Sequence, residues 1–149
     1  MGGNNGSMTT SSRIQKKSST ARKLAFSVRS SASSVPGVRE RVTALAHDIG
    51  FTSDQVFEIG LAVGEACANA VMHAGTSGSC FRVEAFERDG EVVIRVTDPG
   101  EDTLPPLQRD PDRVGGLGLF LMRRLMDRIS LDMTPSGTRL TMSRRKRAA

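Results

Sequence analysis

Three polar side chains share one side of a predicted helix. Glu65, Asn69 and His73 follow one another at intervals of four residues, so a helix places them in one row. With a rise of about 1.5 Å per residue, neighbours in that row lie roughly 6 Å apart. A carboxylate can act as a general base toward a hydroxyl, and a carboxamide oxygen can bind Mg²⁺. Small neighbours such as Gly64 and Ala68 leave room for a ligand beside the row.

Two segments further along the chain could contribute to the same chemistry. Asp98 ends an apolar stretch and precedes Pro99-Gly100, so its carboxylate could accept a hydrogen bond from an amine such as the adenine N6. Three glycines between positions 115 and 118 precede a predicted helix. Glycines let a backbone approach a phosphate closely, and a helix N-terminus favours anions.

Each of these features also has an ordinary structural explanation. A helix can carry a solvated Glu65 and an Asn69 that bonds the backbone, and Asp-Pro-Gly is a good turn sequence. His73 suits a helix end. With two histidines and no Cys-x-x-Cys pair, the sequence does not indicate a zinc site. Cys67 and Cys80 are expected to be buried thiols in a reducing compartment.

Alternating and helical periodicity predict the elements that position these residues. The helix with the polar row begins at Thr52 or Ser53 and ends at Gly75, and the loop over 99–115 contains four prolines. The other elements are helices over 36–49 and from about 116 to 129, and strands over 23–29, 81–86, 92–98, 131–133 and 138–142. Tight turns between neighbouring strands favour an antiparallel sheet. We therefore expect an α+β fold, a two-layer sandwich with about five strands and helices on one face.

Charge is unevenly distributed along the 149 residues, a length that suits one domain. Nine of the 21 basic residues lie in the first 24 and last six positions. The region between these ends contains the other 12 basic residues and 16 acidic residues. We expect a disordered Ser/Gly-rich basic tail over 1–21, one domain over 22–143 and a basic tail over 144–149. Without Trp or Tyr, no direct nucleic-acid partner is indicated. No apolar run is long enough for a membrane span, so we expect a cytoplasmic protein.

In this order and at these separations, the motifs resemble those of the GHKL (Bergerat-fold) ATPases. Within that superfamily they are most similar to the anti-sigma-factor serine kinases of bacterial partner switching. The segment 65–74 resembles the N box, the segment 96–100 the first glycine box, the segment 115–122 the second, and Gly137-Thr138 the last motif. The resemblance covers roughly residues 23–143.

The resemblance implies a role for each matching residue. Glu65 would be the catalytic base, and Asn69 would bind Mg²⁺ at the ATP phosphates. Residues 101–115 would form the ATP lid, in which Asp102 stands where the family usually has glycine. Arg39 would face a protein partner, or else be a solvated helix charge. The other implied nucleotide-binding residues are Asp98, Gly100, Gly116, Leu117, Gly118 and Thr138.

The function implied is an ATP-dependent serine/threonine protein kinase that is also an anti-sigma factor, with ATP and Mg²⁺ as cofactors. It would phosphorylate a serine on a STAS-type antagonist and sequester a sigma factor, and the family commonly forms homodimers. The alternative is a nucleotide-dependent binding module that switches partners without kinase activity. The presence of Glu65 argues mildly for the kinase.

Overall fold

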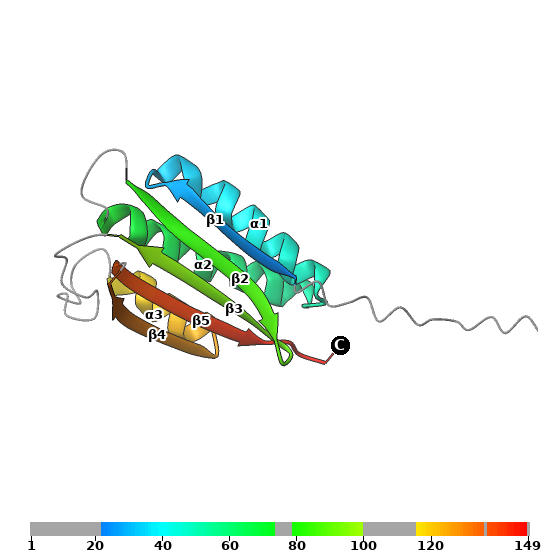
Figure 1. The fold of residues 1–149 in the computed structure, drawn as a ribbon. Coiled ribbons are helices and arrows are strands. Elements are labelled where there is room, and N and C mark those ends of the chain that lie inside the picture. The colour runs from blue at the N-terminus through cyan, green and yellow to red at the C-terminus, as the bar shows by residue number, and fades with distance from the viewer. Residues whose placement is uncertain (1–21, 74–78, 100–115, 136, 149) are drawn as a thin grey trace, which may run out of the picture.

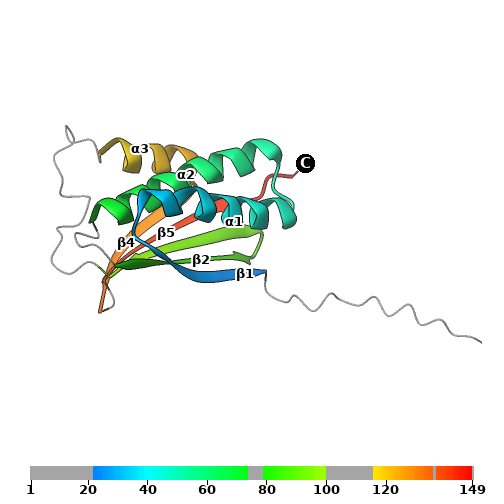
Figure 2. The ribbon, with the colours of Figure 1, turned by 90° about the horizontal axis from the view of Figure 1, so that it is seen from above.

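The structure, a computed structural model, describes residues 22–73, 79–99, 116–135 and 137–148. Its elements in chain order are β1 (Lys23–Arg29), a short 3-10 helix (Ala32–Ser34), α1 (Val35–Asp48), α2 (Ser53–His73), β2 (Cys80–Arg88), β3 (Glu91–Asp98), α3 (Gly116–Leu125), β4 (Arg128–Thr134) and β5 (Gly137–Arg145). The strands form one sheet in the order β1-β2-β3-β5-β4, and every neighbouring pair is antiparallel. All three α-helices lie on one face of this sheet (Figures 1 and 2). The predicted α+β sandwich is confirmed.

The period-two pattern of the strands builds the core. In β2, Phe81, Val83 and Ala85 are buried, and the residues between them are partly or fully exposed. The β2–β3 turn has positive φ at Asp89 (51°) and Gly90 (79°), which is the geometry of a two-residue hairpin turn. Buried positions therefore face the helices, and the alternate positions form the open face of the sheet.

Helix α2 is the central element of the helical layer. Thr52 caps it: its Oγ1 accepts a hydrogen bond from the Gln55 amide (3.2 Å), and Gln55 Oε1 accepts one from the Thr52 amide (3.3 Å). This reciprocal pair is a capping box. The α2 residues Ile59, Val63 and Ala66 are buried, so this side of the helix packs into the core. The expected stop at Gly75 lies outside the described residues.

Helix α3 is shorter than predicted. Its helical spacing predicts an end at Ile129, but the helix ends at Leu125, and Ile129 lies in β4. The Met126 amide donates the last helical hydrogen bond to Met122, whereas the Asp127 amide donates to the Ser143 carbonyl in β5 (2.9 Å). The chain therefore leaves the helix and begins to pair with β5 at Asp127. Helical spacing persists by chance because Ile129 also faces inward from its strand.

The C-terminal tail was predicted to begin at residue 144, but the ordered fold continues past that residue. Strand β5 continues to Arg145, and Arg144 is only 5% exposed. Arg144 forms an ion pair with Glu58 of α2 and donates to the carbonyl of Leu125 at the end of α3. Lys146 Nζ donates to the Ile49 carbonyl (2.6 Å). These basic side chains therefore join the sheet to the helices. The expected N-terminal tail, residues 1–21, lies outside the described residues.

Candidate functional site

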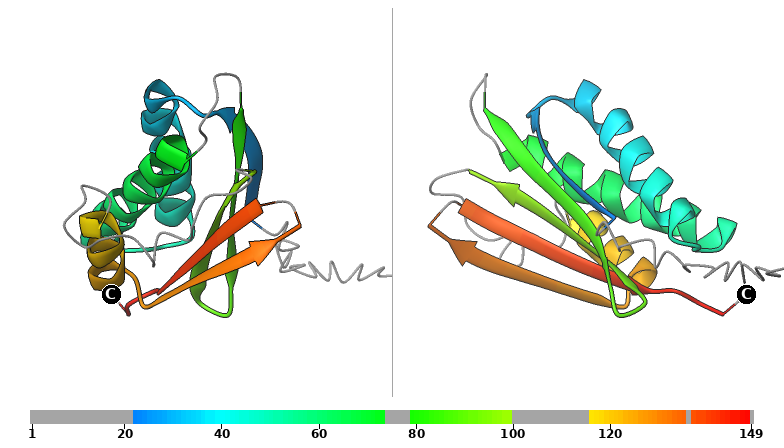
Figure 3. Two further views of the ribbon diagram at one scale, coloured as in Figure 1. Left: turned by 90° about the vertical axis from the view of Figure 1, so that its left-hand side faces the viewer. Right: turned by 45° about the vertical axis from the view of Figure 1, so that its right-hand side comes forward.

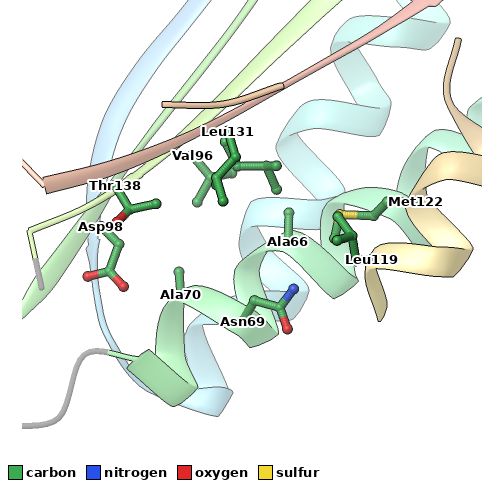
Figure 4. Close-up of a pocket in the computed structure, with 10 residues that line it drawn as sticks. Ala66, Asn69, Ala70, Val96, Asp98, Leu119, Met122, Leu131 and Thr138 are labelled. Carbon is green, nitrogen blue, oxygen red and sulfur yellow. The ribbon is translucent and has the colours of Figure 1, made fainter. Parts of the chain in front are cut away.

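A pocket lies between the sheet and helices α2 and α3 (Figure 4). Its apolar lining comes from Ala66, Ala70, Val96, Leu119, Met122, Leu131 and Leu140, and its polar lining from Asn69, Asp98 and Thr138. Asp98 and Thr138 lie together on the sheet, while α3 forms the opposite side. The pocket thus combines flat apolar walls with a few polar groups, as small-molecule sites do.

The sheet side of the pocket depends on a close approach between two strands. Asp98 ends β3 and pairs in register with Thr138 of β5. The neighbouring Gly137 has φ of +120°, and a Cβ there would overlap the carbonyl oxygen of Asp98. Only glycine fits this position. It lets β5 begin directly beside the end of β3, so Asp98, of which only 6% is exposed, lines the pocket together with Thr138.

The helical side brings Glu65 and Asn69 to the start of α3. A Cβ on Gly118 would lie 2.8 Å from Glu65 Oε2 and 3.7 Å from both terminal atoms of Asn69. Helix α3 begins at Gly116 and has no acidic residue in its first turn. Its N-terminus carries the positive end of the helix dipole. The arrangement therefore places a carboxylate and a carboxamide beside a helix end that favours anions.

The oxygen donors at this end fit a magnesium ion that is shared with a ligand. Among the described residues, no group of three or more His, Cys, Asp or Glu could hold a metal by itself. Asn69 Oδ1 is a hard oxygen donor, and Mg²⁺ commonly takes few protein oxygens and completes its shell with phosphate and water. The residues present thus suit a metal that arrives with a phosphate ligand.

Part of the predicted site cannot be compared with the structure. Gly100 and the expected lid, residues 101–115 with Asp102, lie outside the described residues. Gly116 and Leu117 lie in the first turn of α3. His73 is the last residue of α2. The residues that the structure does bring together are Glu65, Asn69, Asp98, Gly118 and Thr138.

The small residues that make room for a ligand differ from those expected. Ala66 and Ala70 belong to the buried core and also line the pocket. Gly64 instead faces α1, where a Cβ would lie 2.5 Å from Nη2 of Arg39. Ala66 and Ala70 lie four residues apart in α2, on the same side of the helix as Asn69. This spacing of small residues was the signal that could have identified the pocket wall.

Arg39 lies along α2 although its side chain is exposed. A Cβ on Gly60 would lie 3.6 Å from Arg39 Cγ, so the stem of Arg39 crosses Gly60 and its guanidinium reaches Gly64. Burial raises the pKa of the Cys67 thiol to about 12, and the positive charge of Arg39 opposes that rise. Cys80, expected to be buried, is exposed at the start of β2.

Comparison with known proteins identifies the class to which this fold and site belong. Residues 28–144 match the histidine kinase-like ATPase domain family, and the chain belongs to that family. A crystal structure of the RsbU and RsbW domains of a Mycobacterium tuberculosis protein has the same fold, with a TM-score of 0.66 and 23% identity over 85% of this chain and 33% of that chain.

Two bacterial relatives define the family more closely. The chain is 33% identical to serine-protein kinase RsbW of Halalkalibacterium halodurans over 119 residues, which cover 72% of this chain and 73% of that protein. It is 31% identical to serine-protein kinase RsbW of Bacillus subtilis over 122 residues, which cover 72% and 75% of the two chains. The resemblance to the anti-sigma-factor serine kinases is therefore confirmed. In the part that the structure describes, no helix is long and apolar enough to cross a membrane.

Proposed function

We propose that the protein is an ATP-dependent serine/threonine protein kinase and anti-sigma factor. It phosphorylates a serine on a STAS-type antagonist and sequesters a sigma factor. The observation that carries this proposal is the contact of Glu65 and Asn69 with the first turn of α3, directly beside the pocket that ends at Asp98. A base, a metal-binding oxygen and an anion-binding helix end are then within reach of one nucleotide.

The pocket binds the adenine ring of the nucleotide, and the N-terminal end of α3 binds its phosphates. The adenine ring lies against Ala66, Ala70 and the inner side chains of the sheet, and its amine donates a hydrogen bond to Asp98, which Thr138 supports. The phosphates lie at the backbone of residues 116–118, where amide groups and the helix dipole favour negative charge. Asn69 would hold Mg²⁺, which would neutralise charge on the phosphates.

Glu65 acts on the incoming serine. Its carboxylate accepts the hydroxyl proton while the serine oxygen bonds to the γ-phosphorus, and the bond from that phosphorus to the bridging oxygen breaks to release ADP. Catalysis rests mainly on positioning and on charge stabilisation. Gly118 has no side chain, so the Glu65 carboxylate can approach the backbone at the phosphate end of the site.

The Glu65→Gln variant tests this assignment because it keeps the shape of the side chain and removes the base. With labelled ATP and candidate STAS-type proteins, the variant should bind ATP like the wild type and lose phosphotransfer by a factor of about 10² or more. Asp98→Asn serves as a control that should weaken ATP binding instead. A normal transfer rate for Glu65→Gln would refute the role of Glu65.

The same experiment addresses the alternative function. If the wild-type protein phosphorylates none of the candidate antagonists but binds one of them only with ATP or ADP present, it is a nucleotide-dependent switch without kinase activity. Arg39, held against Gly60 and Gly64 of α2, is the proposed partner contact. Partner affinity of Arg39→Ala and the mass of the protein in solution test this contact and the proposed homodimer.

A further inference from the structure

The face of the sheet opposite the helices is not covered by any described element (Figures 2 and 3). Its side chains are those that alternate with the core residues of each strand. Strand register aligns Arg82, Thr97 and Arg139 across β2, β3 and β5. The next row aligns Glu84 with Arg95. These positions belong to the open face because their chain neighbours, such as the buried Val96, face the helices.

The open face is strongly basic. Its charged side chains from the described strands are eight cations, Lys23, Arg29, Arg82, Arg88, Arg95, Arg128, Arg139 and Arg145, and three anions, Glu84, Glu91 and Asp132. The sequence analysis found the region between the tails to be slightly acidic. The fold separates these charges, because alternation along the strands turns the arginines to one side, away from the acidic residues of the helical layer.

Three arginines near the centre of this face outnumber the two anions beside them, Glu84 opposite Arg95 and Asp132 opposite Arg139. Arg95 lies diagonally from both Arg82 and Arg139 in the register, so these residues are roughly 7 Å from it. Arg82 pairs with Glu84 (3.4 Å). Arg95 lies over the ring of Phe86, 5.1 Å from its centre, and Nε of Arg139 is buried without a hydrogen-bond partner. Like charges this close repel one another, and an anionic partner would relieve the repulsion.

We propose that the open face of the sheet, centred on Arg82, Arg95 and Arg139, binds an acidic surface of a partner protein. The face lies on the other side of the sheet from the pocket, so it can be occupied together with that site. This inference does not depend on kinase activity. Long-range attraction toward such a face would also speed association, most strongly at low salt.

The chemistry of the face excludes other occupants. A second copy of this chain would oppose two faces that each carry five net positive charges. A membrane would need exposed apolar anchors, and among the described residues the large exposed apolar side chains, Phe57, Met72, Phe120 and Met133, do not lie at these positions. A single-stranded nucleic acid would need free aromatic rings for stacking, whereas Arg88 and Arg95 both lie over Phe86.

Charge-reversal variants of the sheet and of helix α3 test the proposal. The Arg95→Glu/Arg139→Glu variant removes two cations from the open face, and the matched control Arg123→Glu/Arg124→Glu makes the same change at exposed positions of α3. Poly-L-glutamate serves as the acidic polypeptide probe, measured by titration at two salt concentrations. We expect the sheet variant to weaken binding at least tenfold and to lose most of the salt dependence, and the control to change affinity less than threefold.

Several results would overturn the proposal. Equal weakening by both variants would assign the binding to net charge, and no weakening by either would assign it to the terminal basic segments. The wild type could also bind an oligonucleotide more tightly than poly-L-glutamate. If the sheet variant lost this oligonucleotide binding, the open face would be a nucleic-acid surface. Circular dichroism checks folding, and Arg95→Gln/Arg139→Gln replaces the charge reversal if that variant is unfolded.

Discussion

The substitution Gly118→Ala separates the stability of α3 from its role at the site. Gly118 has helical backbone geometry in the first turn of α3, and the Cβ of an alanine there would lie 2.8 Å from Glu65 Oε2. Ordinary contact begins at 3.4 Å. The Glu65 carboxylate or the start of α3 must therefore move by about 0.6 Å. Glu65 is a flexible side chain, so it is the group that moves.

The two consequences have opposite signs. Alanine is more favourable than glycine in a helix by up to about 1 kcal/mol, so the folded protein should be as stable as the wild type or slightly more stable. A misplacement of about 1 Å at a reacting group can cost 10²-fold in rate. A shift of about 0.6 Å should therefore lower phosphotransfer roughly tenfold, while ATP affinity changes little because the pocket is unaltered.

The assay compares thermal unfolding, binding of a fluorescent ATP analogue and the rate of antagonist phosphorylation. Gly37→Ala is the matched control, since a Cβ at Gly37 meets no atom within 4 Å and it also lies in a helix. It should gain stability without losing activity. If Gly118→Ala transfers phosphate at the wild-type rate, Glu65 is not positioned by α3 and the proposed arrangement of the site is wrong.

Three further substitutions or reactions give distinct outcomes. Gly137→Ala should lower the unfolding free energy by about 2–3 kcal/mol, because alanine is strained at φ of +120°; urea unfolding measures this, and a loss under 0.5 kcal/mol contradicts it. Gly64→Ala should displace the guanidinium of Arg39 and weaken partner binding as much as Arg39→Ala does, without lowering the melting temperature, because alanine is also more favourable than glycine in a helix. Cys67, whose pKa is raised to about 12 by burial, stays a protonated thiol at neutral pH and should resist alkylation in the folded protein. Rapid alkylation of Cys67 at pH 8, detected by mass spectrometry, would show that it is accessible.

Local sequence patterns were sufficient for the elements and for part of the site. The row of Glu65 and Asn69 depends on helical periodicity within α2, and Asp98 depends on its place at the end of an apolar strand, so neighbouring residues determine both. The contact of Gly118 with Glu65 joins two elements 53 positions apart. No pattern within either segment indicates which helix will pack against which.

The wrong prediction for Arg144 and the missed basic face have the same cause, because both depend on contacts between segments far apart in the sequence. Arg144 resembles part of a basic tail because the residues around it are basic. Its burial follows from strand parity, which turns it toward Glu58 and the end of α3. The basic face of the sheet was missed for a related reason. Its arginines are scattered along the sequence and come together only through the strand register.

The two ends of α3 are held differently, and this has a mechanical consequence. At the C-terminal end, the Arg144 guanidinium joins the Leu125 carbonyl to Glu58 of α2. At the N-terminal end, the helix meets the site through Gly118, where no side chain is present to interlock. A ten-residue helix is about 15 Å long, so a tilt of about 5° around the fixed end would move the first turn by roughly 1 Å. Because the C-terminal end is the one held by Arg144, a tilt of α3 around it would change the spacing between Gly118 and Glu65 more than the spacing at Leu125.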